Sequence, residues 1–220
     1  MKFSIITLFP DMLSGPLEIS MLKKARDNGL VDIEVINLRE FGVGSGKQVD
    51  DTPYGGGDGM LLKPEPVVNA IEHTKSQQQA TDNSMVILLT PQGDSYTQAT
   101  ARQLSGESHI ILVCGHYEGF DERIRAFVDW QISIGDYVLT GGEIPAMAVV
   151  DSVTRLLPGV LGGERSAVDD SFADGETLEY PQYTRPNQFR GMEVPDVLLS
   201  GNHGEIDQWR QAQARQRRRG

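Results

Sequence analysis

The sequence predicts an α/β fold, in which helices cover a mostly parallel sheet, followed by a small, mainly helical C-terminal domain. Apolar, strand-like runs alternate five times with helical stretches over roughly the first 157 residues, a pattern typical of such a sheet. At 220 residues, with 39% hydrophobic and 23% charged side chains, the chain can bury a core. No apolar run approaches the roughly 18 residues that cross a bilayer, so we expect no membrane association.

Five buried strands account for the sheet. We expect them over residues 3–9, 31–38, 85–89, 109–113 and 130–134, because each is a short apolar or alternating run that stops at turn residues. Helical spacing predicts one helix that closes at 28–29, one that begins at Pro64, and others over about 96–104, 121–128 and 143–157. Pro64 suits a first helical turn, where an N–H would have no partner in the helix.

The character of the chain changes after Pro158. The following residues are rich in glycine and acidic side chains and show little periodicity. A segment punctuated by prolines then leads to a helix from about His203. We therefore expect a first domain over 1–160, a flexible linker over 161–177 and a small helical domain over 178–220.

The charge of the chain restricts its partners. A formal net charge of −11 argues against a protein that grips nucleic acid over its whole surface. Five arginines between residues 205 and 220 outnumber two acidic residues and form a local basic arm. That arm either binds a polyanion or is a solvated helix end.

Cysteine and histidine usage argues against metal and disulfide frameworks. The single Cys114 excludes an intrachain disulfide and a cysteine-rich zinc site, and it fits a reducing compartment. The four histidines show no metal-ligand spacing. We expect a cytoplasmic protein without a structural metal.

Three loops follow the carboxyl ends of predicted strands. They cover 90–91, 115–119 and 135–142 and consist largely of Gly, Pro and polar residues. Ligands bind beyond the carboxyl ends of the strands in open parallel sheets, so these loops indicate one pocket. Gly141 and Gly142 either turn backbone N–H groups toward a ligand or simply begin the helix that follows.

Two other stretches are rich in glycine. Residues 42–47 lack the first Gly of a phosphate loop and the Ser or Thr after Lys47, so they predict an ordinary loop. Residues 53–60 hold four glycines within five positions. Because glycine loses much backbone entropy on folding, this favours the close approach of nucleic acid, a ligand or another chain over a plain turn.

Two charged positions stay ambiguous on pattern alone. A carboxylate beside a weakly acidic N–H can act as a general base, but the acidic pair Asp169-Asp170 more commonly indicates a solvated linker. Arg155, in an otherwise apolar helix face, is equally ambiguous.

Eight segments together resemble the bacterial tRNA (guanine-N1)-methyltransferases that modify position 37. The similarity extends in order from about residue 1 to residue 210. The segments are 8–12, 49–57, 112–119, 134–143, 158–162, 170–172, 183–186 and 198–203. Chance does not produce so many ordered matches.

This resemblance implies a SPOUT-type fold with a deep trefoil knot, a feature that periodicity alone does not predict. It also implies a homodimer with active sites at the subunit interface, and S-adenosylmethionine as the methyl donor. The donor-binding residues that it implies are Thr90, Pro91, Gly115, Tyr117, Ser133, Ile134, Gly135, Asp136, Tyr137, Val138, Leu139, Gly141, Gly142 and Pro145.

The same resemblance implies the catalytic roles. Asp170 is the base that removes the proton from guanine N1, and Arg155 stabilises the charge that develops on guanine O6. Glu118 assists the target base or a Mg²⁺ ion. The linker that carries Asp170 orders when tRNA binds, and Asp170 of one chain serves the donor bound to the other.

tRNA is the implied partner. We expect RNA contacts at Gly57, Gly59, Arg185, His203 and Arg210.

The chain departs from the family pattern in three places. His116 stands where some members carry Arg, and Asp58 interrupts the glycine run. Members of the family usually continue with a longer helical tail, so the helical domain is expected to be short here. Either the lack of that tail reduces tRNA affinity, or the arginines at 217–219 partly substitute for it.

Two alternatives remain at this point. An RNA-binding protein of the same fold that has lost its chemistry would bind tRNA with a strong salt dependence and would not bind the donor. Another SPOUT enzyme, acting on ribose or rRNA, would need no base aimed at guanine N1, so Asp170 discriminates against it.

Overall fold

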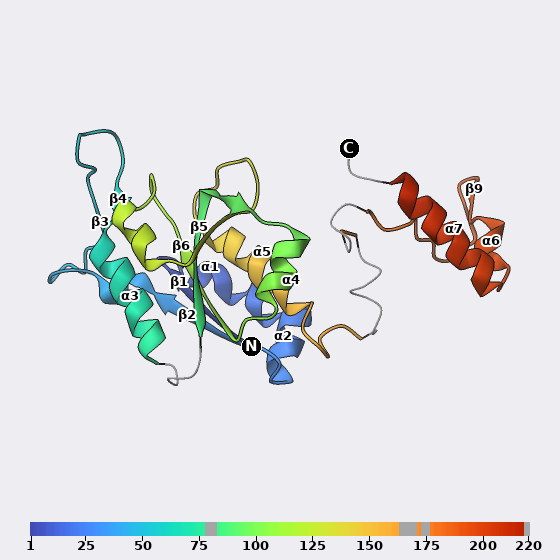
Figure 1. Cartoon of the computed structure of the whole chain (residues 1–220), viewed down its shortest axis with the longest axis horizontal. Coiled ribbons are helices and arrows are strands. Elements are labelled where there is room, and N and C mark those ends of the chain that lie inside the picture. The colour runs from blue at the N-terminus through green and yellow to red at the C-terminus, as the bar shows by residue number, and fades with distance from the viewer. Residues whose placement is uncertain (78–82, 163–170, 173–176, 218–220) are drawn as a thin grey trace. The chain divides into compact units, whose positions relative to one another are not determined.

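The chain divides into two compact units in a computed structural model. The first unit is 1–161 and the second is 162–220 (Figure 1). The structure describes residues 1–77, 83–162, 171–172 and 177–217. The predicted linker, 161–177, therefore lies mostly outside the described residues, and so does Asp170.

A five-stranded parallel sheet forms the centre of the first unit. Its strands lie in the order β2-β1-β6-β5-β7, and every neighbouring pair is parallel. The strands are β1 (Lys2–Thr7), β2 (Asp32–Asn37), β5 (Ser84–Ser95), β6 (His109–Cys114) and β7 (Trp130–Ser133). The predicted α/β class and parallel sheet are confirmed.

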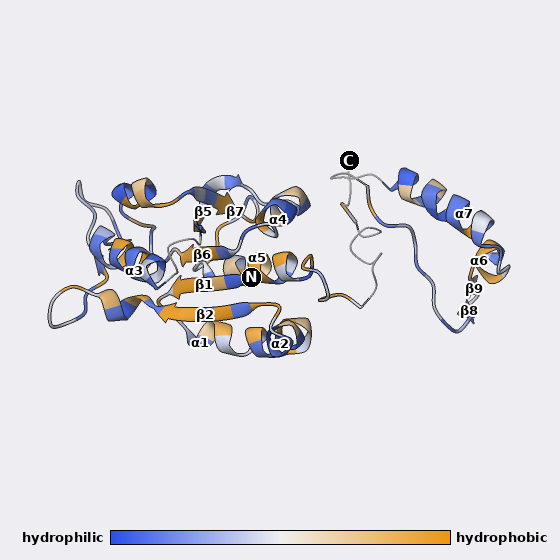
Figure 2. Ribbon diagram, turned by 60° about the horizontal axis from the view of Figure 1, so that its bottom comes forward, coloured by the Kyte–Doolittle hydropathy of each residue, from blue (hydrophilic) through white to orange (hydrophobic). Residues whose placement is uncertain are grey.

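Helices cover both faces of this sheet (Figure 2), and an apolar cluster fills each interface. One face packs against α1 (Asp11–Ser14), α2 (Ser20–Asp27), α4 (Gln98–Leu104) and α5 (Glu143–Thr154). The other packs against α3 (Pro64–Ser76) and the 3₁₀ helix η3 (Glu122–Phe127). Alternation within β6 produces the two layers, since Ile110 and Leu112 belong to the first cluster and Ile111 and Val113 to the second.

One strand runs further than its sequence predicts. β5 was expected to stop at Thr90-Pro91, but Leu89 and Asp94 both pair with Ile132 of β7, and the residues between them bulge out of the ladder. Gly93 makes this possible, because a Cβ there would lie 2.4 Å from the backbone nitrogen of Ile132. The strand bends and then continues.

Other elements are short. The first unit also contains the 3₁₀ helices η1 (Pro16–Glu18) and η2 (Leu38–Phe41) and the hairpin of β3 (Asp50–Asp51) and β4 (Leu61–Leu62). The helix expected over 121–128 is the 3₁₀ helix η3, and the helix expected over 143–157 ends at Thr154.

The second unit is the smaller of the two. It holds the hairpin of β8 (Gln188–Phe189) and β9 (Met192–Glu193), the short helix α6 (Asp196–Leu199) and the helix α7 (His203–Gln216). The predicted start of a helix near His203 is confirmed, and Asn202 caps it by accepting a hydrogen bond from the Glu205 backbone. Within the described ranges, no helix is long and apolar enough to cross a membrane.

A network of hydrogen bonds and one ion pair links the amino-terminal halves of three neighbouring strands. Ser4 of β1 lies 2.9 Å from His109 Nε2 of β6 and donates to Glu34 of β2 at 3.3 Å. Lys2 Nζ lies 2.8 Å from the Glu34 carboxylate. The hydrogen bond from Lys2, followed by its charge, outweighs partial burial and lowers the pKa of Glu34.

Replacing Glu34 by Gln should therefore destabilise the fold in a pH-dependent way. Because the folded pKa is lowered, the stabilisation is present above the unfolded pKa and is lost as pH falls through the folded value. The side chain is 47% exposed, so we expect a deficit below about 1 kcal/mol. Urea unfolding at pH 7 and at about pH 3 measures it. A deficit that grows at acid pH would contradict the assignment.

Candidate active site

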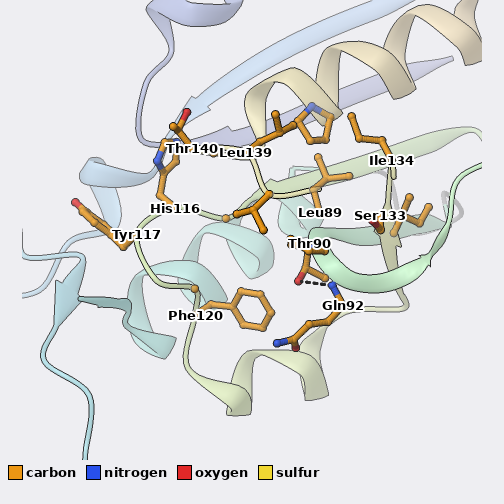
Figure 3. A pocket seen from close by; sticks show the side chains of 18 of the residues that line it. Leu89, Thr90, Gln92, His116, Tyr117, Phe120, Ser133, Ile134, Leu139 and Thr140 are labelled. Carbon is orange, nitrogen blue, oxygen red and sulfur yellow. Dashed lines mark hydrogen bonds between the residues drawn. The ribbon is translucent and has the colours of Figure 1, made fainter. Parts of the chain in front are cut away.

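A cavity of about 400 Å³ opens at the carboxyl ends of β5, β6 and β7 (Figure 3). Three loops and the 3₁₀ helix η3 line it; the loops are the bulge of β5, the loop after β6 and the loop between β7 and α5. Its lining residues are Leu89, Thr90, Pro91, Gln92, Gly115, His116, Tyr117, Glu118, Gly119, Phe120, Glu122, Arg125, Ile132, Ser133, Ile134, Gly135, Tyr137, Val138, Leu139, Thr140, Gly141, Gly142 and Pro145.

The structure brings nearly all of the predicted donor-binding residues together. Thirteen of the fourteen line this one cavity, and Glu118 lines it with them. Asp136 is the exception: it is exposed and lies in the same loop as its neighbours, but it does not line the cavity. The role of the fourteen predicted residues in binding a donor stays a prediction.

Two glycines allow the loop after β7 to reach the end of β6. The Gly142 N–H donates to the Gly115 carbonyl at 2.9 Å. Next to this bond, His116 and Gly141 form an isolated antiparallel β-bridge. A Cβ on Gly142 would lie 2.6 Å from Cys114 Cα, and one on Gly141 would lie 2.4 Å from the His116 ring. Any larger residue would push these two backbone segments apart.

A buried carboxylate lies directly behind this contact. Glu143, the first residue of α5, has 0% of its surface exposed. Its oxygens accept hydrogen bonds from Thr7 of β1 and from His116 Nε2.

The Cys114 thiol, at the end of β6, is also buried. Burial, and secondarily the charge of Glu143, raises the pKa of this thiol well above its usual value, so the thiol stays neutral.

Tyr117 adopts an uncommon backbone conformation at the cavity. Its φ of 61° lies in the left-handed region, which is strained for a residue other than glycine. Burial, followed by the nearby carboxylate of Asp50, raises the pKa of its hydroxyl, and the opposing effect of Arg39 is smaller. The phenol therefore stays protonated and can donate a hydrogen bond at neutral pH.

The glycine-rich loop 53–60 approaches the cavity through Gly59. A Cβ on Gly59 would lie 2.4 Å from Glu118 Cγ, and the Glu118 N–H donates to the Met60 carbonyl at 3.1 Å. Gly57 lies further out and is exposed, with a φ of 124°. Tyr54, at the start of the loop, is fully exposed. The loop thus presents an open surface next to Glu118.

Arg125 of η3 also lines the cavity. Its guanidinium donates to the Gln92 and Gln131 side chains and pairs with Glu122 at 2.8 Å. It also lies 5.1 Å from the centre of the Phe120 ring. Arg125, Phe120 and Gln92 could not be predicted from the sequence, because only the fold brings these three residues to the same cavity.

Of the predicted catalytic residues, Glu118 lines the cavity and Arg155 does not. Asp170 lies outside the described residues. Arg155 follows the carboxyl end of α5, where its N–H donates to the Asp151 carbonyl. Since α5 starts at the cavity and has 12 residues, its other end is about 18 Å away at roughly 1.5 Å per residue. Arg155 is accordingly not a lining residue.

The remaining predicted RNA contacts belong to the second unit. Arg185 and His203 are exposed. The Arg210 guanidinium lies 4.9 Å from the centre of the Tyr180 ring and 3.7 Å from the Asp207 carboxylate. These positions combine cationic and aromatic groups, and their role in RNA binding stays a prediction.

Metal ligands are sparse in the part of the chain that is described. It contains no group of three or more His, Cys, Asp or Glu side chains placed to hold an ion. Glu118 and Glu122 both line the cavity, but among these residues neither belongs to such a group.

Comparisons with known proteins agree with this picture. The family model described as tRNA (guanine-1)-methyltransferase TrmD matches residues 1–220. The chain is 57% identical, over 99% of its own length and 88% of the relative's, to the tRNA (guanine-N(1)-)-methyltransferase of Geobacillus kaustophilus. It is 56% identical, over the same shares, to that of Anoxybacillus flavithermus. It is 54% identical, over 97% and 85%, to that of Staphylococcus haemolyticus.

Replacing Gly142 by Ala should destabilise the protein by about 1–3 kcal/mol, because the new methyl meets backbone atoms of Cys114 and Gly115 that cannot rotate away. Gly46→Ala is the matched control, since its Cβ would point into open space. Thermal unfolding of both variants measures the difference. Equal stabilities would mean that the contact between the loops is not as tight as described.

Proposed function

This chain belongs to the tRNA (guanine-1)-methyltransferase family, and from that premise we propose that it transfers a methyl group from S-adenosylmethionine to N1 of guanosine 37 in tRNA. The observation that carries the proposal is the gathering of three strand-end loops around one cavity, in a chain that matches the family over its whole length. The relatives are named as enzymes, so nothing favours an inactive RNA-binding protein.

The cavity suits a nucleoside donor. Its size lies within the range of ligand pockets, and its wall combines apolar side chains with exposed backbone groups. Leu89, Ile132 and Leu139 offer apolar contacts for an adenine ring. The peptide groups around Gly115 and Gly141 offer hydrogen bonds to its edge.

The chemistry requires alignment and removal of one proton. When bound, the donor supplies a methyl group already activated by its sulfonium. The protein must hold guanine N1 in line with that methyl and accept the N1 proton. We assign the proton to the Asp170 carboxylate and the stabilisation of charge on O6 to the Arg155 guanidinium. Glu118, beside the cavity, assists the target base.

Two subunits complete each site in this proposal. Arg155 lies about one helix length, roughly 18 Å, from the cavity of its own chain, so it fits a role at the cavity of a second copy. Exposed apolar side chains around the cavity support such a contact: Val138 is 84%, Tyr137 54% and Ile144 47% exposed. We propose a homodimer in which Arg155 and Asp170 serve the partner's donor.

The path of the chain supports a trefoil knot in the first unit. β7 lies at one edge of the sheet, yet the chain after it returns across the end of β6, where Gly142 bonds Gly115. It then enters α5, which contacts β1 and β6. We propose that this return passes through the loop formed by the preceding residues, so that the donor site is the knot itself.

The tRNA is proposed to contact both units. Gly57 and Gly59 lie on the open loop beside Glu118, and Arg185, His203 and Arg210 lie on the second unit, which we propose as the tRNA-binding domain. The described residues do not fit a Mg²⁺ site, since no three His, Cys, Asp or Glu side chains among them are placed to hold an ion. The proposed reaction therefore has no step that uses Mg²⁺.

Replacing Asp170 by Asn should lower methyl transfer to a tRNA transcript carrying guanosine 37 by about 10²–10⁴-fold, because the amide cannot accept the N1 proton. Donor affinity, measured by calorimetry, should stay unchanged, since the role assigned to Asp170 is to accept the N1 proton and not to contact the donor. Asp169→Asn is the matched control and should retain activity. Equal transfer rates for Asp170→Asn and the unmodified protein would overturn the base assignment.

A mixed dimer tests the sharing of residues between subunits. One subunit carries Asp170→Asn, and the other carries Leu139→Arg, which fills the cavity. If Asp170 acts across the interface, one complete site forms and about half of the activity returns, although both parent homodimers are inactive. If Asp170 acts within its own chain, the mixed dimer stays inactive.

A further inference from the structure

Glu143, the first residue of α5, is a buried carboxylate outside the proposed catalytic residues. No step of the proposed reaction uses it, and it is completely enclosed. Burying a charge is costly unless hydrogen bonds and an opposite charge or dipole compensate it. A fully buried glutamate at the start of a helix therefore calls for an explanation in terms of what it holds.

Glu143 joins three segments that are far apart in the sequence. Thr7, at the end of β1, donates to Oε1. His116, from the loop after β6, places Nε2 at 2.9 Å from Oε1 and 2.8 Å from Oε2. Because a carboxylate only accepts, the imidazole Nε2 carries the hydrogen. The helix start adds a favourable dipole for the negative charge.

The contacts extend outward from this pair on both sides. The Phe9 N–H donates to Thr7 Oγ1 at 2.9 Å, and the Phe9 ring lies 4.7 Å from the His116 ring. The His116 side chain is 11% exposed and lines the cavity. The position of the His116 side chain thus depends on its hydrogen bonds to Glu143 and on its ring contact with Phe9.

The carboxylate also lies directly behind the cavity wall. A Cβ on Gly141 would lie 2.5 Å from Glu143 Oε2 and 2.4 Å from His116 Nε2. Gly141 and Gly142 line the cavity themselves. The Glu143–His116 pair therefore packs directly against this part of the cavity wall.

We propose that Glu143 and His116 are positioning residues for the methyl donor: their buried hydrogen bonds, with that of Thr7, hold the loop after β6 against the start of α5 and so fix the wall of the donor cavity. Neither needs to touch the reacting atoms. The inference rests on the proposed function, because it takes the cavity to be the donor site.

The test measures the binding of S-adenosylmethionine and S-adenosylhomocysteine to the full chain by calorimetry, together with kcat and KM for methyl transfer. His116→Ala leaves the buried carboxylate short of a donor and should weaken both ligands by about ten- to a hundredfold. Because the wall and not the reacting group is disturbed, KM for the donor should rise by a similar factor while kcat at saturation changes less than about threefold.

Restoration of the hydrogen bonds should restore binding. His116→Arg places two N–H donors opposite the two carboxylate oxygens and should recover donor affinity to within about fivefold of the unmodified protein. Glu143→Gln retains one acceptor without the charge, so it should lie between the unmodified protein and His116→Ala. Tyr96→Phe is the matched control: it removes the 2.6 Å hydrogen bond to Ser152 of α5, away from the cavity, and should leave donor affinity unchanged.

Each result decides one question. If the unmodified protein does not bind the donor, the proposed function itself fails. If it binds, and His116→Ala binds equally well, the positioning role is wrong. If the variants bind S-adenosylmethionine more weakly but bind S-adenosylhomocysteine, whose sulfur is uncharged, as well as the unmodified protein does, Glu143 acts through its charge on the sulfonium. That result would overturn the proposal that Glu143 acts by fixing the cavity wall. A loss of kcat alone in a variant that melts normally would contradict it as well.

Discussion

The candidate site depends on one close approach between two backbone segments. The loop that follows the edge strand β7 returns to the end of the central strand β6, where the Gly142 N–H donates to the Gly115 carbonyl. Only glycine fits at 141 and 142, because a Cβ at either position would overlap Cys114 or His116. This contact closes one side of the cavity and sets where α5 begins. The cavity wall and the buried Glu143 both follow from that position.

Much of this arrangement could be predicted from residue patterns. Apolar runs bounded by Pro and Gly located all five strands of the sheet, and the rule that ligands bind at strand carboxyl ends grouped three loops into one pocket. The prediction for the end of β5 was wrong for a physical reason. Thr90-Pro91 is a strong turn signal, but Gly93 lets the chain bulge and pair again with Ile132. Local patterns cannot express such a return to the same ladder.

Other features were invisible for lack of a local signal. His116 and Glu143 are 27 positions apart, and nothing in either segment indicates that one imidazole will meet one buried carboxylate. The hydrogen bond from Arg125 to Gln92 could not be predicted for the same reason, because it joins the 3₁₀ helix η3 to the bulge of β5, which are 33 positions apart. Arg155 shows the converse case. Resemblance assigned it a role, and the length of α5 then separates it from its own cavity, which gives the proposed dimer a structural reason.

The central claim is that the methyl donor binds in the cavity at the ends of β5, β6 and β7. Ultraviolet crosslinking of methyl-labelled S-adenosylmethionine to the full chain, with the attachment site mapped by mass spectrometry, tests it most directly. The account predicts label on peptides that contain residues 89–92, 115–120 or 132–145, and its loss when excess S-adenosylhomocysteine competes. Label confined to other peptides, or no specific label at saturating donor, would contradict it.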